Sequence, residues 1–511
     1  MRITNKIMQN NTLYNINNNK VMQDELYTQM TTGQKVTKPS DDPVVAIRSL
    51  RLRSNLNQVS QYYGKNVPDA ENWLELTESS VSTTVDVITE MVGYFQKGSK
   101  SSLTTSDRNA ILEGLRQGRA EVYATGDADY AGRTIFTGYR TDMKLSFQAD
   151  MKESYSINEQ LSPAALDTFT YVNLEDVKEL GAGTYDTSAT TSQDIGSFQV
   201  RRLRLAYDKL DEGVAPTINV ATGYDADGNI EYSTVGTATA VSLNGTTDPY
   251  RMVSDPTYTG YDEDAFIFVP ETGEILLGEK AFESLNALSA DSEIMINYTK
   301  TEWNKGDLRP EHYFACTDEE GIEYNSEYLT KDGKTEKQSI KYDVGFNQKL
   351  EVNTTADEVY IHGVGRTVDE MIRLLENMQE VDKSVAELEK MVGDSSYDQD
   401  AVNTKLEAAK KAQTYLSDTL EKRFEHGITE MQGYLDTANL ALTTIGNRGM
   451  RLDLISNRLS AQEASFTSLS SKNDEADIAE LAVKLSSAGL TYDASLAATG
   501  KLLKTTLLNY L

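Results

Sequence analysis

The sequence predicts an α+β fold in which long antiparallel helices from both termini form coiled-coil or helical-bundle domains, with a β-rich domain inserted between them. Two observations lead to this prediction. No proline lies between Pro68 and Pro163 or after Pro310, and such stretches can hold long helices because proline breaks helix interiors. Residues 137–365 instead gather turn-forming glycines and short runs of β-branched and aromatic residues, which are typical of strands.

Both stretches without proline carry apolar residues at intervals of three and four, the spacing of a helix with one buried face. In the first stretch this pattern runs from Val67 to Phe95, and a second helix is expected to begin near Ser106. In the second stretch one pattern covers residues 371–392 and another covers residues 428–459. A repeat near 3.5 residues favours helices wound on helices, and an ordinary helical bundle remains an alternative.

The β-rich insertion divides the helical part of the sequence into two arms. Because the chain leaves the helical part and returns to it, the arms are expected to meet again in space. This reasoning predicts five segments. The terminal coiled-coil domain consists of residues 1–43 and 471–511, and the helical domain consists of residues 44–136 and 366–470. The inserted β-rich outer domain consists of residues 137–365.

Each end of the chain carries a narrow apolar stripe on an otherwise polar helix. The N-terminal stripe contains Ile7, Tyr14, Val21, Leu26 and Met30, and the C-terminal stripe contains Ile478, Leu481, Leu485, Tyr492, Leu496, Leu503 and Tyr510. A narrow stripe buries too little apolar area to offset the conformational entropy of ordering a chain end. We therefore expect the stripes to pack against each other and against neighbouring subunits, while docking onto the chain's own domain remains an alternative.

The composition narrows the possible functions. There are 49 Lys and Arg against 79 Asp and Glu, which gives a net charge of −30 and argues against a nucleic-acid partner or an anionic membrane. No apolar run approaches the roughly 18 residues of a membrane helix. A single cysteine, Cys316, excludes an intrachain disulfide. Only three histidines are present, which lowers the expectation of an enzyme because acid–base and metal sites rely on histidine.

Motifs for cofactors or catalysis are incomplete. Residues 181–183 begin a Gly-x-Gly pattern but lack the third glycine, and residues 225–228 resemble part of a calcium loop but fit a hairpin turn better. His312 and Cys316 are four residues apart without a second pair of metal ligands. The basic run at 200–204 is interpreted as a solvated strand face or an intersubunit ion pair. No cofactor and no metal are therefore predicted.

A segment near the N-terminus resembles a known family. The run LYTQMTTGQKVTKPSDDPVVAIRSL at residues 26–50 is similar to the N-terminal region of flagellins and their hook-associated relatives. Its TGxxVxxPSDDP form is that of the FlgL type and includes Gly33, Pro39, Ser40, Asp41, Asp42 and Pro43. Ser40 is expected to cap the next helix, with Asp41 and Asp42 near its positive end.

Further segments support the same resemblance. GRTIFTGYRTDMKLSF at residues 132–147 looks like the FlgL segment where helix gives way to sheet, and it includes Gly132, Arg133, Phe136 and Gly138. Residues 445–459, with Gly446 and Arg448, are similar to the long C-terminal helix of the family, and the tail from Asp477 resembles its terminal helix. The middle of the chain resembles nothing comparable.

The resemblance implies a structural subunit of the bacterial flagellum rather than an enzyme. Its expected place is extracellular, at the junction between hook and filament, after export by the flagellar type III system. The implied partners are the hook-side junction protein, flagellin, further copies of the chain and a cytosolic export chaperone at the C-terminal helix. Two alternatives remain: a filament flagellin, or a flagellar scaffold that carries a glycan-binding adhesin domain in the insertion.

Overall fold

The structure is a computed structural model that describes residues 5–100, 103–174, 177, 191–330 and 338–508. The chain divides into two compact units. Unit 1 consists of Met1–Ala70, Tyr342–Leu350 and Met450–Leu511, and unit 2 consists of Glu71–Lys341 and Glu351–Gly449. Helices at both ends and antiparallel sheets in the middle confirm the predicted α+β class. The five predicted segments are a finer division and stay a prediction.

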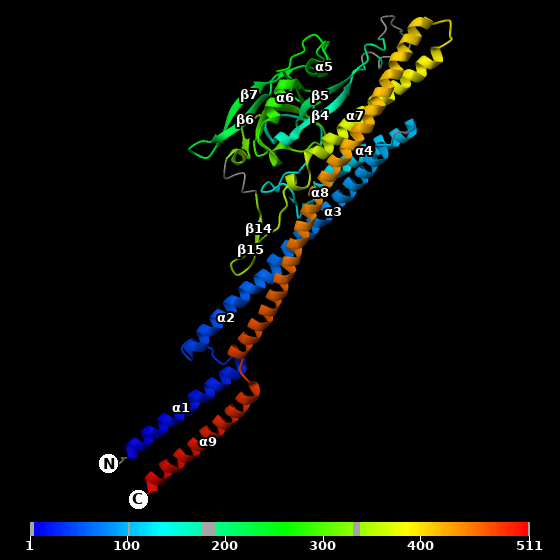
Figure 1. The fold of residues 1–511 in the computed structure, drawn as a ribbon. Helices are drawn as coiled ribbons and strands as arrows, with labels where there is room; N and C mark the ends of the chain where they lie inside the picture. Colours follow the sequence, from blue (N-terminus) through cyan, green and yellow to red (C-terminus); the bar gives the residue numbers. More distant parts are fainter. Residues whose placement is uncertain (1–4, 101–102, 175–176, 178–190, 331–337, 509–511) are drawn as a thin grey trace. The chain divides into compact units, whose positions relative to one another are not determined.

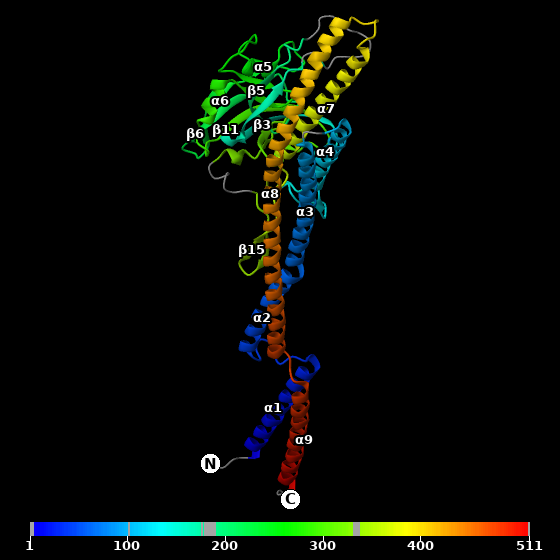
Figure 2. The same cartoon turned by 45° about the vertical axis from the view of Figure 1, so that its right-hand side comes forward.

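Unit 1 is built mainly from helices. They are α1 (Asn5–Thr32), α2 (Pro43–Gln61), the final part of α8 (Gln399–Asp474) and α9 (Ile478–Leu508). A short π-helix (Tyr62–Asn66) follows α2, and most of the hairpin of β14 (Lys341–Gly345) and β15 (Gln348–Glu351) also belongs to this unit. Figures 1 and 2 both show α1 and α9 side by side.

Polar contacts attach α2 to the end of α8. The Ser49 hydroxyl donates to Asp474 Oδ2 at 2.9 Å, and Arg53 Nη2 lies 3.0 Å from the same oxygen. Later in α2 and earlier in α8, Ser60 Oγ donates to the Glu463 carboxylate. Because residues later in α2 contact residues earlier in α8, the two helices run antiparallel.

The helices of unit 2 are α3 (Val67–Gly98), α4 (Thr105–Thr125), α7 (His362–Met391) and the first part of α8. The predicted apolar faces are buried, as Val81, Ile88, Leu375 and Ile445 show. Helix α4 begins at Thr105, one residue before the expected start near Ser106. The side chain of Thr104 accepts the Asp107 N–H and forms the cap of α4.

The β-rich part of unit 2 contains two larger sheets. The first has the order β13 (Glu323–Tyr324), β12 (Ala315–Thr317), β3 (Met151–Leu161), β11 (Ile294–Trp303), β6 (Thr217–Tyr224) and β7 (Ile230–Thr237). The second has the order β4 (Leu166–Val172), β5 (Ser197–Arg204), β10 (Glu274–Leu277), β9 (Phe266–Val269) and β8 (Thr239–Ala240). A small ribbon of β1 (Asp129–Tyr130) and β2 (Arg133–Thr134) precedes them. The predicted hairpin turn at 225–228 connects β6 and β7, whereas residues 181–183 lie outside the described residues.

The two sheets share one apolar core. Ile157 of β3 and Ile296 of β11 meet Leu203 of β5 and Ile275 of β10 in that core. Leu276 points to the opposite face of the second sheet, where α5 (Pro249–Ser254) covers it. This alternation follows from the two-residue period of a strand. The second sheet is therefore covered on both faces, and α6 (Glu279–Asn286) lies beside it.

Two of the three arginines in the basic run of β5, Arg202 and Arg204, are largely buried and paired within the chain, which corrects the interpretation of the run as a solvated face or an intersubunit ion pair, while Arg201 stays partly exposed. Strand alternation places Arg202 and Arg204 on the face opposite Leu203, toward α7 and α8. Arg202 Nη2 lies 2.8 Å from Glu370 Oε2 of α7, and Arg202 Nη1 lies 2.5 Å from Glu274 Oε1 of β10.

Helix α8 completes this ion network, which we define as Arg202, Arg204, Arg373 and Arg423 with Asp167, Glu274, Glu370 and Glu430. Arg423 Nη2 lies 2.8 Å from Glu370 Oε2 and 3.0 Å from Glu430 Oε2. Burial by itself would raise the pKa of Glu370, but the guanidinium groups of Arg202, Arg423 and Arg204 hold it well below its ordinary value. Four cations and four carboxylates thus neutralise one another where the second sheet meets the helices.

Removing Arg202 is expected to destabilise unit 2 strongly. The change Arg202→Met leaves Glu274 and Glu370 buried without their main cation, and such a loss costs about 3 to 5 kcal/mol in the free energy of unfolding. Urea unfolding followed by tryptophan fluorescence would measure it, since both tryptophans, Trp73 and Trp303, lie in unit 2.

The matched control is Arg201→Met on the same strand. Arg201 pairs with Glu279, whose side chain is 51% exposed, so the control is expected to cost less than about 1 kcal/mol. Equal losses for the two variants would contradict a special role of the ion network.

Candidate functional site

The pairing of α1 with α9 is the first candidate site. Its apolar contact is small and consists of Leu26, Leu481 and Ala488, with Ala476 and Leu485 packed on them. Asn19 Nδ2 donates to Ser495 Oγ at 3.1 Å farther along the pair. The antiparallel arrangement follows, because positions early in α1 face positions late in α9.

The predicted interface residues divide into two groups. Leu26 and Leu481 are buried between the helices, and Leu485 and Tyr492 are half-buried. The others are 39% to 67% exposed: Ile7, Tyr14, Val21, Met30, Ile478 and Leu496. The side chain of Leu503 and all of Tyr510 lie outside the described residues. The helix pair thus covers one face of each stripe and leaves the rest on the surface of unit 1.

Sequence reasoning missed further exposed apolar residues on α1, α2 and α9. They are Met8, Leu13 and Tyr27 on α1, Val44, Ile47 and Leu50 on α2, and Val483 and Leu490 on α9, and Met22, which continues the N-terminal stripe, is exposed as well. Several lie off the predicted stripes, so each helix has more than one apolar face. We call this set, together with the exposed stripe residues, the arm surface. Apolar residues outside the periodic stripe were the signal that could have revealed it.

The segment between α1 and α2 forms a compact turn. Gly33 adopts a φ of +68°, which a glycine tolerates without strain, and its N–H donates to Gln29 O at 2.8 Å. The expected cap was wrong: the side chain of Asp42, and not Ser40, accepts the Val44 and Val45 N–H groups, with Pro43 at the first position of α2.

Asp41 and Ser40 stabilise the turn itself. Asp41 Oδ2 accepts the Lys38 N–H at 3.0 Å, and the Ser40 hydroxyl donates to Asp41 Oδ1 at 3.3 Å. Pro39 precedes them in the exposed turn. The PSDDP pattern therefore ends one helix and begins the next.

The family-type segment after α4 is a packed turn in unit 2. Gly132 and Gly138 have φ values of +80° and +62°. The Arg133 guanidinium stacks on Trp73 at 5.3 Å, and the buried Phe136 ring meets Tyr360 edge-on at 4.9 Å. These residues fix the place where the helices give way to the sheets.

The motif residues of α8 have different surroundings. Arg448 Nη1 donates to the Asn353 carbonyl at 2.6 Å, and its Nη2 lies 3.6 Å from Glu351 Oε1. Gly446 has open space where a side chain would stand. The arginine thus anchors the end of the insertion to α8, while no close contact explains the glycine.

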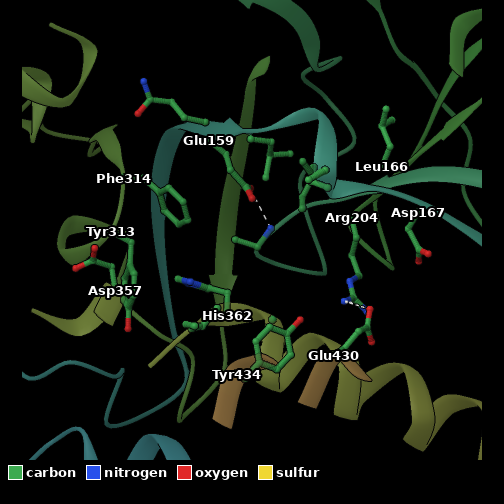
Figure 3. A pocket seen from close by; sticks show the side chains of 18 of the residues that line it. Glu159, Leu166, Asp167, Arg204, Tyr313, Phe314, Asp357, His362, Glu430 and Tyr434 are labelled. Carbon is green, nitrogen blue, oxygen red and sulfur yellow. Dashed lines mark hydrogen bonds and ion pairs between the residues drawn. The ribbon is translucent and has the colours of Figure 1, made fainter. Parts of the chain in front are cut away.

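A cavity of about 620 Å³ in unit 2 is the second candidate site. Figure 3 shows its walls, which include Glu159, His362, Tyr313, Phe314 and Tyr434. They come from β3, the start of α7, the segment before β12, and α8. Sequence reasoning could not find the cavity because these residues are far apart in the chain.

Two titratable groups in this cavity have shifted pKa values. Burial raises the pKa of Glu159 to about 7, although the Ala206 N–H, the Tyr298 hydroxyl and Arg366 oppose the shift. Burial, with the charge of Arg366, lowers the pKa of His362 to about 3, so this ring is neutral near pH 7. Its neighbours Tyr313 and Tyr207 lie 4.4 and 4.9 Å away, measured between ring centroids.

Other features of the described residues bear on the predicted chemistry. His312 Nε2 donates to the Lys144 carbonyl oxygen at 3.1 Å, and burial lowers the pKa of His312 to about 4. Cys316 is buried in the sheet core. Over the described ranges, no three His, Cys, Asp or Glu side chains come together in a way that could hold a metal ion. None of the helices described is both long and apolar enough to cross a membrane.

The Glu159→Gln variant should change the pH dependence of stability. A carboxyl whose pKa is raised on folding keeps its proton in the folded state, so wild-type stability falls as pH rises from about 4.5 toward 7. The variant lacks this loss, and its stability relative to wild type should increase by about 2 to 3 kcal/mol between pH 5 and pH 8.

Urea unfolding at several pH values would test this expectation. Glu302→Gln on the exposed face of β11 serves as the control, because Glu302 is solvent-exposed and pairs only with Lys152 at the surface. A stability difference between Glu159→Gln and wild type that stays constant with pH would contradict the raised pKa.

Comparisons with known proteins agree with the N-terminal motifs. Residues 3–141 match the family described as the bacterial flagellin N-terminal helical region. The flagellar hook-associated protein 3 of Salmonella typhimurium is 31% identical over 145 residues, which are 28% of this chain and 45% of that protein. The Escherichia coli protein of the same name is 30% identical with the same coverage. A flagellin of Clostridium tyrobutyricum is 25% identical over 117 residues, which are 23% of this chain and 31% of the flagellin.

The chain therefore spans less than half the length of the curated relatives it matches. Two solved structures were also similar: the flagellar junction protein FlgL of Legionella pneumophila, at 11% identity and a TM-score of 0.28, and FlgL of Xanthomonas campestris, at 12% and 0.26. They cover 84% and 81% of this chain and 100% and 99% of their own. The sequence matches confirm that this chain resembles the flagellin superfamily, and within it the hook-associated, FlgL-type proteins.

Proposed function

We propose that the chain is a structural subunit of the bacterial flagellum that forms the junction between hook and filament and nucleates flagellin assembly. The observation that carries the proposal is the arm surface on α1, α2 and α9, where large apolar side chains remain exposed. Burying one such side chain contributes about 1.5 to 3 kcal/mol. Several of them together favour packing against neighbouring subunits, as a tube of terminal helices would require.

The proposed partners follow from the resemblance. They are the hook-side junction protein, flagellin and further copies of the chain, with a cytosolic export chaperone on the C-terminal helix before export by the type III system. The proposed place is extracellular, in the flagellum. We also propose a structural protein rather than an enzyme, since the relatives it matches are named as flagellar components.

Two alternatives differ in what the chain contributes to the flagellum. A filament flagellin would share the N-terminal region, and one matched relative carries that name. The PSDDP turn and the segment at residues 132–147 favour the junction type instead. A scaffold with a glycan-binding adhesin domain would use the β-rich insertion and is compatible with the same arms.

Charged substitutions on the arm surface should block assembly without unfolding the chain. Tyr14 and Leu490 are 67% and 69% exposed, so Tyr14→Asp and Leu490→Asp should leave the melting temperature within a few degrees of wild type. In an assembly each carboxylate would be buried without a partner, which is costly. The measurement is incorporation of the purified variant onto isolated hooks that carry the hook-side junction protein.

Val214→Asp is the matched control, because Val214 is 49% exposed but lies in a loop of the β-rich part. It should assemble as wild type does. Normal incorporation of both arm variants would show that the arm surface is not an interface.

Deleting the gene should separate a junction protein from a filament protein. The expected cells keep normal hooks and release flagellin monomers into the medium, because the growing end lacks its template. Adding the purified protein back should restore filaments when it is present in far fewer copies than flagellin. Finding the chain as the main component of isolated filaments would instead identify it as a flagellin.

A further inference from the structure

The cavity of unit 2 has the size and the walls of a ligand site. Its volume of about 620 Å³ falls within the range of roughly 300 to 1,000 Å³ that is typical of small-molecule pockets. All of its lining residues belong to unit 2. Nothing in the proposed junction role uses this cavity.

Aromatic side chains and carboxylates dominate the lining. Tyr313, Phe314 and Tyr434 supply aromatic rings, and Figure 3 shows them around the same space as Glu159. The lining contains four carboxylates against one arginine: Glu159, Asp167, Asp357 and Glu430, with Arg204. Arg204 lies 3.0 Å from Glu370 and 3.5 Å from Glu430, so its charge is already matched. Asp167 and Glu430 are matched as well, because they pair with Arg202 and Arg423 in the ion network.

Glu159 differs from the other carboxylates of the wall. Its side chain is 4% exposed, and no cation of the described residues lies within ion-pair distance of it. Both of its hydrogen bonds, from Ala206 N at 2.9 Å and from the Tyr298 hydroxyl at 2.7 Å, go to Oε2. The remaining oxygen, Oε1, accepts no hydrogen bond from the described residues, and Figure 3 shows the side chain directed into the cavity. Solvent reaches this oxygen from the cavity, so a ligand that donates a hydrogen bond could take the place of water there.

We propose that this cavity binds a small organic cation, with its ammonium group at Glu159 Oε1 and its apolar body against Tyr313, Phe314 and Tyr434. A carboxylate attracts an ammonium strongly where water is excluded, and aromatic faces add cation–π attraction of about 0.5 to 2 kcal/mol. An anionic ligand would meet the Glu159 carboxylate, which has no cation of the described residues within ion-pair distance. A neutral sugar could donate to Oε1 but would gain nothing from the charge of this carboxylate.

Calorimetric titration of the purified full chain with two matched probes would test the proposal, at pH 8, because the pKa of Glu159 is raised to about 7 and the carboxylate form prevails above that pH. 2-Phenylethylammonium carries the cation, and 2-phenylethanol has nearly the same shape without the charge. The ammonium compound is expected to bind at least about tenfold more tightly, which corresponds to about 1.4 kcal/mol. Equal affinities, or binding of a neutral disaccharide such as maltose in place of the ammonium compound, would overturn the proposal.

Three variants make the test specific to the cavity. Glu159→Gln keeps an acceptor for Ala206 N and Tyr298 but removes the charge, and it should weaken ammonium binding roughly tenfold. Ala164 lines the cavity and is exposed, so the larger side chain of Ala164→Trp is expected to occupy part of the cavity and to abolish binding. The surface variant Glu302→Gln should bind as wild type does. Melting curves would show that the variants are folded. Unchanged affinity of both folded cavity variants for the ammonium compound would overturn the proposal. The absence of ammonium binding to the wild-type chain would overturn it as well.

Discussion

The buried ion network is the interaction on which the arrangement of unit 2 depends. Arg202 and Arg204 extend from one strand, Glu370 lies on α7, and Arg423 and Glu430 lie on α8. An apolar contact tolerates small shifts, but a buried charge that loses its partner costs several kcal/mol. The network therefore fixes which strand meets which helical turn. The cavity depends on the same contacts, because Arg204 and Glu430 form part of its wall.

Unit 1 is stabilised in a different way. Its helix pair α1 and α9 has a core of only a few apolar side chains, while many larger ones stay on the surface. A short core cannot offset much of the entropy of two ordered helices. The apolar side chains that this core does not cover are the ones available for the proposed contacts with other subunits. A net charge of −30 disfavours unspecific association of separate copies.

Local signals in the sequence predicted the elements and the packing of the two terminal helices on each other, but they did not predict which side chains of the sheets and helices of unit 2 would meet. The spacing of Val81, Ile88 and Leu375 shows the helical period directly, so the buried faces were predictable. The start of α4 was predicted to within one residue, but the cap of α2 was placed wrongly at Ser40, because several capping residues stand next to one another and the sequence does not show which one adopts the extended backbone. The structure selects Thr104 and Asp42.

The basic run at 200–204 shows why the site geometry was harder to predict. Alternation along a strand already indicates that Arg202 and Arg204 share a face, but their partners lie 35 to 226 residues away in sequence, from Asp167 to Glu430. A run of like charges is normally solvated, so the interpretation as a surface feature was reasonable and wrong. Glu159 was not predicted for a similar reason. It is one of 79 acidic residues and stands in no distinctive sequence pattern. Only the fold places it in an aromatic-lined cavity. Burial is what raises the pKa of Glu159. The alternation of side chains along β3 indicates this burial only in part, because residues of α7 and α8 complete the cavity wall.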